Sequence, residues 1–296
     1  MTGTLHQVAP EPARTFLRDV LSAHASPQAL AWLAQQQEKY TTDYARRTLY
    51  MAFSMVPRFF SKTPLELSGA QHERADELRS GWDPSTWTCD QAARTFLLLL
   101  MPTQDEDQYQ QTLKQLFDTA DMNEQRTLYG ALPLLAFPER WVAQTAEGIR
   151  TNITSVLDAI VLRNPYPAEH LADPAWNQLV LKSVFTDRPL YQIDGLDKRV
   201  NAELAHTLLD YVHERWSAGR TVTPELWRMI GPFLQPESEA DIKRLLQSDN
   251  PLERQAGMLA CWQSNDLIVS QWVDRDTDPS TLTWDEIGAR HQETKN

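Results

Sequence analysis

The sequence predicts an all-α protein, and three observations support this fold class. Nearly every segment places apolar residues at helical spacing. Many of these segments begin with a capping residue, often followed by proline at the first helical position. Glycine is scarce, with 10 residues in 296, so few tight β-turns can form. Because the expected helices are short and joined by short turns, we predict an irregular helical-repeat solenoid of HEAT or armadillo type with about 12–15 helices, although no fixed period recurs along the chain.

The first half of the chain contains several recognisable helix starts. Ser26 precedes Pro27 as an N-cap, and Thr88-x-x-Gln91 and Asp121-x-x-Glu124 have the spacing of capping boxes. The helices expected here lie near residues 16–21, 27–34, 43–59, 71–79, 92–101, 109–117, 124–135, 138–142 and 149–161.

A central helix is expected from Asp173 to Thr186. Asp173 can serve as its N-cap, with Pro174 at the first helical position. Two apolar strips predict burial on both sides, because only a narrow polar edge separates them. The first strip contains Trp176, Leu179, Val180 and Val184, and the second contains Leu181 and Phe185.

The C-terminal part predicts further helices and one ambiguous segment. Asn201 begins a helix that ends at Gly219, Thr223 begins another, and a helix pair follows over residues 238–247 and 250–263. Asn250-Pro251 resembles the start of the second helix of a HEAT-type repeat. Leu267–Val273 has the composition of a strand without an evident partner, and residues 274–282 predict a loop before a short helix.

No low-complexity linker divides the chain, so we expect a single domain over residues 1–296. Within it we distinguish N-terminal helices (1–60), a central core (164–233) and C-terminal HEAT-like helices (238–296). The loop Ser61–Leu67 is the expected weakest joint.

Composition excludes several classes of partner. A formal net charge of −12 and a pI near 5.0 disfavour nucleic acid and anionic membrane surfaces, which select basic proteins. The longest apolar run, Phe96 to Met101, is far shorter than a membrane span of about 18–20 residues, and the N-terminus lacks the pattern of a secretory signal. Cys89 and Cys261 match no metal spacing and suit buried packing. We therefore expect a cytoplasmic protein without a transmembrane segment.

One predicted helix face carries a pattern that resembles a metal site. Glu203, His206, Asp210 and His213 fall within an arc of about 80° on the helix after Asn201. Glu-x-x-His is half of a di-iron motif, and its second half is missing from the chain. We therefore expect a solvated surface face, with no metal and no cofactor. The chain also lacks His-Glu-x-x-His, nucleophile-elbow and Walker motifs.

The segment Asp187–Val200 is long for a connection without regular structure, which often marks function. Three aliphatic side chains are expected to fix it to the helices: Leu190, Ile193 and Leu196. Its mixed charged, amide and aromatic groups suit a small polar ligand; in the alternative, Asp197 and Arg199 only cap and tie the loop. The candidate ligand-binding residues, including the adjoining helix ends, are Asn177, Lys182, Arg188, Tyr191, Asp194, Asp197, Arg199, Asn201 and Arg215.

Four runs between residues 164 and 233 are recognisable: NPYP from Asn164, DPAWNQLVLK from Asp173, GLDxRxN from Gly195 and LDYxxERWxAGR from Leu209, where x is any residue. Together they resemble the EboA family. The resemblance implies a place in bacterial or algal-plastid gene clusters, beside a prenyltransferase-like membrane protein and sugar- or cyclitol-type enzyme homologues. It also implies a role in secondary metabolism and in the export of metabolites or precursors. It implies no catalytic residues.

We therefore expect a non-enzymatic binding or adaptor protein that supports processing or export of a small-molecule metabolite in an Ebo-type pathway. Its expected partners are that metabolite and other proteins of the same gene cluster. The alternative is an enzyme acting on a small polar or prenylated metabolite. In it, Asp194, Asp197 or His170 would perform acid–base chemistry and Lys182 or Arg199 would hold an anionic group. A third interpretation is a scaffold that docks partners in a concave groove.

Overall fold

A computed structural model describes residues 9–273 and 283–295 of the chain. Over these ranges the protein forms sixteen α-helices, several 3-10 helices and no strand. The all-α prediction is therefore confirmed, and the described helices slightly outnumber the expected 12–15. The HEAT- or armadillo-like solenoid stays a prediction. The chain divides into two compact units, Met1–Leu171 and Ala172–Asn296, which we call unit 1 and unit 2. A single domain over residues 1–296 also stays a prediction.

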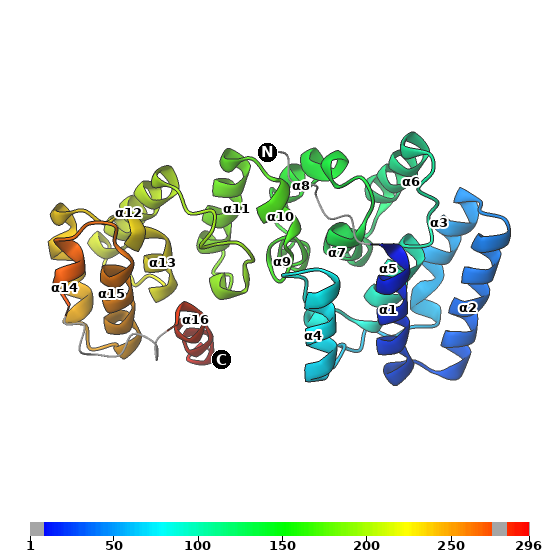
Figure 1. Ribbon diagram of the computed structural model, residues 1–296, viewed down its shortest axis with the longest axis horizontal. Coiled ribbons are helices and arrows are strands. Elements are labelled where there is room, and N and C mark those ends of the chain that lie inside the picture. Colours follow the sequence, from blue (N-terminus) through cyan, green and yellow to red (C-terminus); the bar gives the residue numbers. More distant parts are fainter. Residues whose placement is uncertain (1–8, 274–282, 296) are drawn as a thin grey trace. The chain divides into compact units, whose positions relative to one another are not determined.

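The described part of unit 1 contains ten α-helices (Figure 1). They are α1 (Pro10–His24), α2 (Pro27–Thr42), α3 (Arg46–Met55), α4 (Gly69–Leu78), α5 (Cys89–Leu98), α6 (Glu106–Thr119), α7 (Met122–Ala131), α8 (Val142–Gly148), α9 (Thr154–Val161) and α10 (Tyr166–His170). The short 3-10 helices of this unit are η1 (Val56–Arg58), η2 (Pro84–Thr86), η3 (Leu132–Leu134) and η4 (Pro138–Trp141).

The core of unit 1 is built around α5. Every residue from Cys89 to Leu98 is buried, and the helix packs against α1, α2, α3 and α7. Its C-terminal end begins the longest apolar run of the sequence, but its first turns bury polar side chains as well. Buried polar groups destabilise a fold unless they find partners, so these side chains determine how α5 is held. They are Asp90, Gln91, Arg94 and Thr95.

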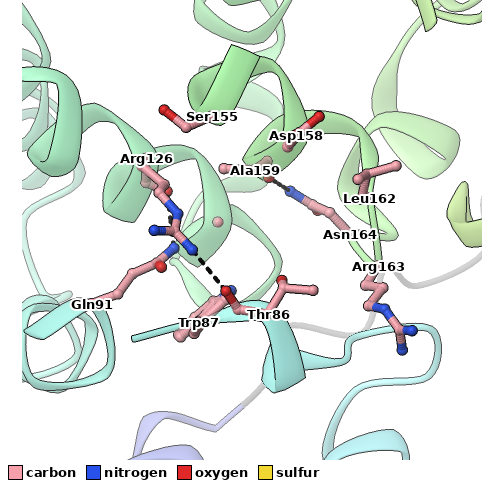
Figure 2. A pocket seen from close by; sticks show the side chains of 11 residues that line it. Thr86, Trp87, Gln91, Arg126, Ser155, Asp158, Ala159, Leu162, Arg163 and Asn164 are labelled. Carbon is pink, nitrogen blue, oxygen red and sulfur yellow. Dashed lines mark hydrogen bonds between the residues drawn. The ribbon is translucent and has the colours of Figure 1, made fainter. Parts of the chain in front are cut away.

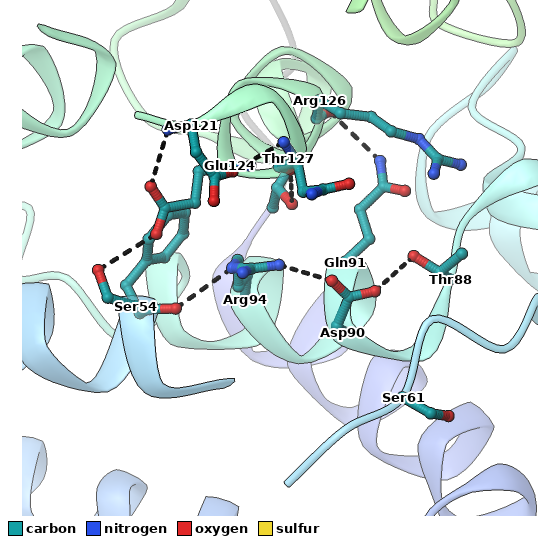
Figure 3. Close-up of polar contacts among 12 residues, drawn as sticks. Ser54, Ser61, Thr88, Asp90, Gln91, Arg94, Asp121, Glu124, Arg126 and Thr127 are labelled. Atoms are coloured by element: carbon teal, nitrogen blue, oxygen red, sulfur yellow. Dashed lines mark hydrogen bonds and ion pairs between the residues drawn. The ribbon is translucent and has the colours of Figure 1, made fainter. Parts of the chain in front are cut away.

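Asp90 and Arg94 form a buried ion pair one helical turn apart (Figure 3). Arg94 Nη1 donates to Asp90 Oδ2 at 2.7 Å, and Arg94 Nε donates to Phe53 O at 3.2 Å. The guanidinium also lies over the Phe53 ring, 5.5 Å from its centroid. The second Asp90 oxygen accepts from Thr88 Oγ1 at 2.6 Å. The pair therefore fixes α5 to α3 and to the residue that precedes α5.

The two predicted capping boxes have different outcomes. Asp121 begins α7 as predicted: its Oδ1 accepts from two backbone N–H groups at 2.8 and 2.9 Å, and Glu124 Oε2 accepts from Asp121 N at 3.1 Å. Thr88 is the N-cap residue of α5, but its hydroxyl bonds Asp90 instead of the helix backbone. The prediction of a capping box there is wrong, and the Gln91 side chain contacts α7 instead.

The segment Ser61–Leu67, the expected weakest joint, is tied into unit 1. Backbone hydrogen bonds of 2.8 and 2.9 Å connect it with residues 87 and 89, around an isolated antiparallel bridge between Pro64 and Thr88. The boundary between the two compact units instead follows Leu171.

The described part of unit 2 contains six α-helices: α11 (Asp173–Phe185), α12 (Ala202–Ser217), α13 (Trp227–Ile230), α14 (Glu239–Leu246), α15 (Pro251–Gln263) and α16 (Trp284–Glu293). Its 3-10 helices are η5 (Leu190–Gln192), η6 (Pro224–Leu226), η7 (Gly231–Phe233), η8 (Pro236–Ser238) and η9 (Val269–Gln271). Across the described ranges of both units, no helix has the length and apolarity that a bilayer span requires. Both cysteines are free and buried, as expected.

The central helix α11 is buried on one of its two predicted strips. Trp176, Leu179 and Val180 are fully buried, as predicted. Phe185 is 57% exposed, so the prediction of burial is wrong at this position. Its ring lies in the last turn of α11 and packs against Tyr211 of α12 at a centroid distance of 5.1 Å. One neighbouring ring covers part of Phe185 and leaves the rest in water.

Two local predictions in unit 2 need correction. The N-cap of α11 is Ala172, because Asp173 already belongs to the helix and directs its carboxylate to Arg199. Leu267–Val273, predicted as a strand, contains η9, since Asp266 Oδ1 accepts from two backbone N–H groups that follow it, at 2.8 and 3.1 Å. The loop predicted over residues 274–282 lies outside the described residues.

A carboxylate is buried where α16 packs onto η5 and η6. Glu225 is 0% exposed, and neither of its oxygens has a hydrogen-bond partner among the described residues. A Cβ at Gly288 of α16 would lie 2.4 Å from Glu225 Oε1, so this approach requires glycine. Burial raises the pKa of Glu225 to about 7, although the nearby amides of Tyr191 and Leu190 and the charge of Arg228 oppose the rise.

The raised pKa of Glu225 predicts that stability falls as the pH rises. Its ordinary pKa is 4.5 and its pKa in the folded protein is about 7. The contribution of protonated Glu225 to the stability of the fold is therefore complete below pH 4.5 and is lost as the pH rises through 7. The shift corresponds to about 3 kcal/mol. Glu225→Gln, which stays neutral, should therefore unfold at higher urea concentration than the wild type at pH 8, and at a similar concentration at pH 5.

Glu237→Gln is the matched control, because Glu237 is an exposed glutamate of the same unit; it should follow the wild type at both pH values. Burial lowers the pKa of His291, which gives the opposite pH dependence, but His291 is common to all three proteins and cancels in the comparison. Equal stability of Glu225→Gln and the wild type at pH 8 would contradict this account.

Candidate ligand-binding pocket

A cavity of about 300 Å³ lies in unit 1, where α7 packs between α5 and α9. This volume is at the lower end of the range for small-molecule sites. Its walls come from the residues before α5, from α5 and α7, and from α9 and the residues after it (Figure 2). The lining residues are Thr86, Trp87, Gln91, Arg126, Gly130, Ser155, Asp158, Ala159, Leu162, Arg163 and Asn164.

The start of α5 forms one wall of this pocket. The Trp87 ring is held edge-on by Trp82, with centroids 5.6 Å apart. Gln91 Nε2 donates to Arg126 O at 3.3 Å. Because a carbonyl accepts only, the amide NH₂ must face Arg126 O, which fixes Gln91 Oε1 on the other side. That oxygen is buried and has no hydrogen-bond partner within the described ranges.

α7 contributes a glycine and a cation. A Cβ at Gly130 would lie 3.2 Å from Gln91 Nε2 and 3.4 Å from both Nε1 and Cζ2 of Trp87. Glycine in a helix costs about 1 kcal/mol relative to alanine, and here it leaves open space between α7 and α5. One turn earlier, Arg126 Nη2 donates to Thr86 O at 2.7 Å. The pocket therefore has a guanidinium group on its α7 side.

Asn164 follows α9 and holds it against α7. Its Nδ2 donates to Ala159 O at 2.9 Å and to Tyr129 O at 3.1 Å, and its Oδ1 accepts from Tyr166 N at 3.0 Å. Asn164 is buried, so these three bonds satisfy backbone groups that have little or no access to water. The amide thereby sets the distance between the two helices that enclose the pocket.

Arg163 precedes this amide with a left-handed backbone, φ 53°, which is uncommon outside glycine. Its guanidinium forms an ion pair with Asp83, and Asp83 N donates to Arg163 O at 3.2 Å. Burial raises the pKa of Asp83, but hydrogen bonding to Ser85 and the charge of Arg163 outweigh burial, so the pKa lies below its ordinary value. These contacts hold the rim of the pocket in one conformation.

The lining of the pocket suits a small polar molecule. Arg126 and Ser155 supply hydrogen-bond donors, Gln91 and Asp158 supply acceptors, and the Trp87 ring offers an apolar surface. A site of this size needs only a few convergent polar groups to orient a ligand. The arrangement therefore fits reversible binding.

A second concave surface lies on unit 1 between α3 and α6, with a volume of about 770 Å³. Its residues are nearly all exposed, so a molecule there would remain in contact with water. They are Arg46, Arg47, Tyr50, Gln111, Lys114, Gln115 and Asp118. Since Lys114 already pairs with Asp118 at 3.0 Å, we regard the α5–α7–α9 pocket as the better-formed site.

The ligand-binding residues predicted from the sequence belong to unit 2, where they have several separate partners. Asn177 and Asn201 exchange amide hydrogen bonds of 3.3 and 2.8 Å, and Asn201 caps α12 by accepting from Leu204 N at 3.0 Å. Arg199 pairs with Asp173 at 2.5 Å and lies over the Trp176 ring, 5.1 Å from its centroid. The structure thus joins α11, the loop and α12.

Asp197, in the loop, forms an ion pair with Arg228 of α13. Its Oδ2 accepts from Arg228 Nη2 at 2.6 Å, and Arg228 Nη1 donates to Asp285 Oδ1 at 2.8 Å. Arg228 therefore links the loop, α13 and α16. The remaining predicted residues also have partners: Arg215 donates to Thr221 O, Arg188 donates to Thr186 O, the Tyr191 hydroxyl accepts from Gln192, and Lys182 and Asp194 have contacts as well.

The loop Asp187–Val200 contains η5, so it has more regular structure than expected. Leu190, Ile193 and Leu196 are buried, as predicted. The alternative in which Asp197 and Arg199 tie the loop agrees with their ion pairs. That the nine residues bind a ligand stays a prediction.

The predicted solvated face of α12 is confirmed. Its charged side chains are exposed, and the opposite face, made by Leu204, Leu208 and Val212, is buried. His213 Nε2 lies 2.9 Å from Asp241 Oδ2 of α14. In the parts of the chain that the structure describes, no three or more His, Cys, Asp or Glu side chains are grouped to hold a metal ion.

A comparison with protein families identifies the family of this chain. A family model described as "Metabolite traffic protein EboA" matches residues 13–231. The chain belongs to the EboA family. The match confirms the resemblance and includes every residue that lines the pocket, as well as the whole 187–200 loop of this EboA-family protein. No curated protein and no solved structure matches the chain.

Sequence reasoning missed the pocket of this EboA-family protein. Gln91 was interpreted as part of a capping box, and Asn164 only as part of a recognisable run. Two signals pointed to the site: an amide at the start of an otherwise apolar helix, and Gly130 inside a helix where alanine is favoured. Neither signal names the partner helix.

Asn164→Ala should lower the free energy of unfolding by about 3 kcal/mol, because two buried backbone groups and a partly buried one lose their partner. The measurement is urea unfolding at constant pH. Asn152→Ala is the control, since Asn152 is exposed near the start of α9, and it should stay within about 0.5 kcal/mol of the wild type. If Asn164→Ala is as stable as Asn152→Ala, Asn164 does not fix the α7–α9 contact.

Proposed function

We propose that this EboA-family protein is a non-enzymatic metabolite-binding protein. It would hold a small polar molecule in the α5–α7–α9 pocket during its processing or export in a secondary-metabolite (Ebo-type) pathway. The observation that carries this proposal is the pocket, a cavity of about 300 Å³ with donors and acceptors on three helices. The family description, metabolite traffic, supports a small-molecule partner.

Contacts that hold the lining residues in place support the role of the pocket in binding. The side chains that shape it are held in advance: Trp87 by Trp82, Gln91 by Arg126 O, and Asn164 by three backbone bonds. A preformed site loses little conformational entropy when a ligand enters, which increases affinity. A carrier that collects a scarce metabolite benefits from such a site.

Native mass spectrometry of the protein purified from its own host tests the proposal. The wild type should retain a small molecule, and Gly130→Ala should retain at least about fivefold less, because the added methyl enters the pocket beside Gln91 and Trp87. The helix preference of alanine, about 1 kcal/mol, should offset the tight contact, so Gly130→Ala should remain folded.

Gly69→Ala is the matched control, since a Cβ there meets nothing within 4 Å; it should retain as much of the molecule as the wild type. Full occupancy in folded Gly130→Ala would show that the pocket is not the site. Conversion of the retained molecule into a product of different mass, during incubation of the purified protein, would favour the enzymatic alternative.

We further propose that the 187–200 loop is the surface that docks a protein from the same gene cluster. Asp197 keeps 54% of its side chain exposed although it pairs with Arg228, so the loop presents charge in a fixed position. Asp197→Asn combined with Arg199→Gln should weaken capture of such a partner at least about tenfold. The control combines Asp249→Asn with Arg220→Gln, two exposed residues of the same unit; equal capture by both double variants would count against the loop.

The expected solenoid and the cytoplasmic location belong to the same proposal. The α14–α15 pair supports HEAT-like stacking, because the two helices pack together across a turn in which Asn250 Oδ1 accepts from Leu252 N at 2.9 Å. A cytoplasmic protein of this kind would receive the metabolite before export.

A further inference from the structure

The α5–α7–α9 pocket contains a cation without a carboxylate partner. Arg126 donates one hydrogen bond, from Nη2 to the neutral Thr86 O, and it forms no ion pair with any residue that the structure describes. A guanidinium has five N–H donors in a planar fork. The groups that remain match the two oxygens of a carboxylate or phosphate.

A buried acceptor lies beside this cation. Gln91 is 2% exposed, and its Oε1 has no hydrogen-bond partner among the described residues. An unsatisfied buried acceptor costs about 1–3 kcal/mol, so a ligand that donates a hydrogen bond here gains affinity. The donor can be a hydroxyl group that displaces part of the present packing around Oε1, while Arg126 O keeps the other end of the Gln91 amide in place.

Positively and negatively charged side chains line different parts of the pocket. Figure 2 shows the Arg126 guanidinium next to Thr86 and Gln91, and the Asp158 side chain away from them, on α9. An anionic group is attracted to the Arg126 guanidinium and repelled by the Asp158 carboxylate. Hydroxyl groups of the same molecule then face Gln91, Ser155 and Asp158, which all accept hydrogen bonds.

We propose that this pocket binds a small hydroxylated anion, with its carboxylate or phosphate on the Arg126 guanidinium and a hydroxyl group on Gln91 Oε1. The inference rests on the proposed function, since it assigns a ligand class to the same site. The volume of about 300 Å³ has room for roughly ten water-sized groups, so the ligand is small.

Four probes separate the contributions of charge and hydroxyl groups: glycerol 3-phosphate, glycerate, inorganic phosphate and glycerol. Binding to the wild type is followed by protein-observed NMR titration at low salt. Glycerol 3-phosphate or glycerate should bind at least about tenfold more tightly than phosphate, which lacks the carbon-borne hydroxyl groups, and glycerol should not bind detectably. Whichever of the two hydroxylated anions binds more tightly identifies the oxyanion as phosphate or carboxylate.

Three variants test the residue assignment. Arg126→Gln should weaken the tighter anion at least about tenfold, and Arg126→Lys should weaken it less, because lysine keeps the charge but loses the fork. Arg18→Gln removes the same charge from an exposed position of unit 1 and should change affinity less than about twofold. Arg126 makes a single hydrogen bond, so its variants should fold.

The outcomes are distinguishable from those of the proposed function. Equal binding by Arg126→Gln and Arg18→Gln, or glycerol binding as tightly as the anions, would overturn the assignment. A neutral or cationic molecule retained by the wild type in native mass spectrometry would also overturn it, while metabolite binding would stand. No retained molecule, together with no binding of any anion below about 10 mM, would remove both proposals.

Discussion

The buried ion pair between Asp90 and Arg94 determines the geometry of unit 1. Taking two charges out of water costs several kcal/mol each unless both are fully paired. Here the remaining groups are satisfied by Thr88 Oγ1 and Phe53 O. The pair itself lies within α5, but the hydrogen bond from Arg94 Nε to Phe53 O of α3 forms in one rotational setting of α5, and this setting also directs Gln91 toward α7. The pocket thus depends on an interaction that does not line it.

α7 is anchored at both ends, and this keeps the pocket open. At its start, Glu124 Oε1 accepts from Ser54 Oγ of α3 at 3.2 Å (Figure 3). Near its end, Tyr129 O accepts from Asn164 at 3.1 Å. Gly130 lies between α5 and α9 without filling the space between them. The protein can therefore keep a small cavity without the collapse that ordinarily eliminates voids in protein cores.

Helix content and several caps could be predicted, because they depend on residues close together in the sequence. Asp121 and Asn201 cap helices as their local patterns indicate. Phe185 was predicted to be buried, but its exposure depends on how much of its ring Tyr211 and other distant residues cover. The pocket was missed for the same reason: its groups come from segments far apart in the chain. Their meeting requires helix packing angles that no local pattern encodes.

The surroundings of Glu225 show that the region matched by the family model does not end where the folded unit ends. The family match stops at residue 231, yet Glu225, inside the match, is covered by Gly288, which lies beyond it. Gly231 itself is packed so closely on α15 that a Cβ would lie 2.9 Å from Ala260 Cα. A protein shortened to the matched residues would expose this carboxylate to solvent. It would also lack α15, on which η7 packs. In this protein the last helices therefore complete the core of the matched region, and removing them would change the part that remains.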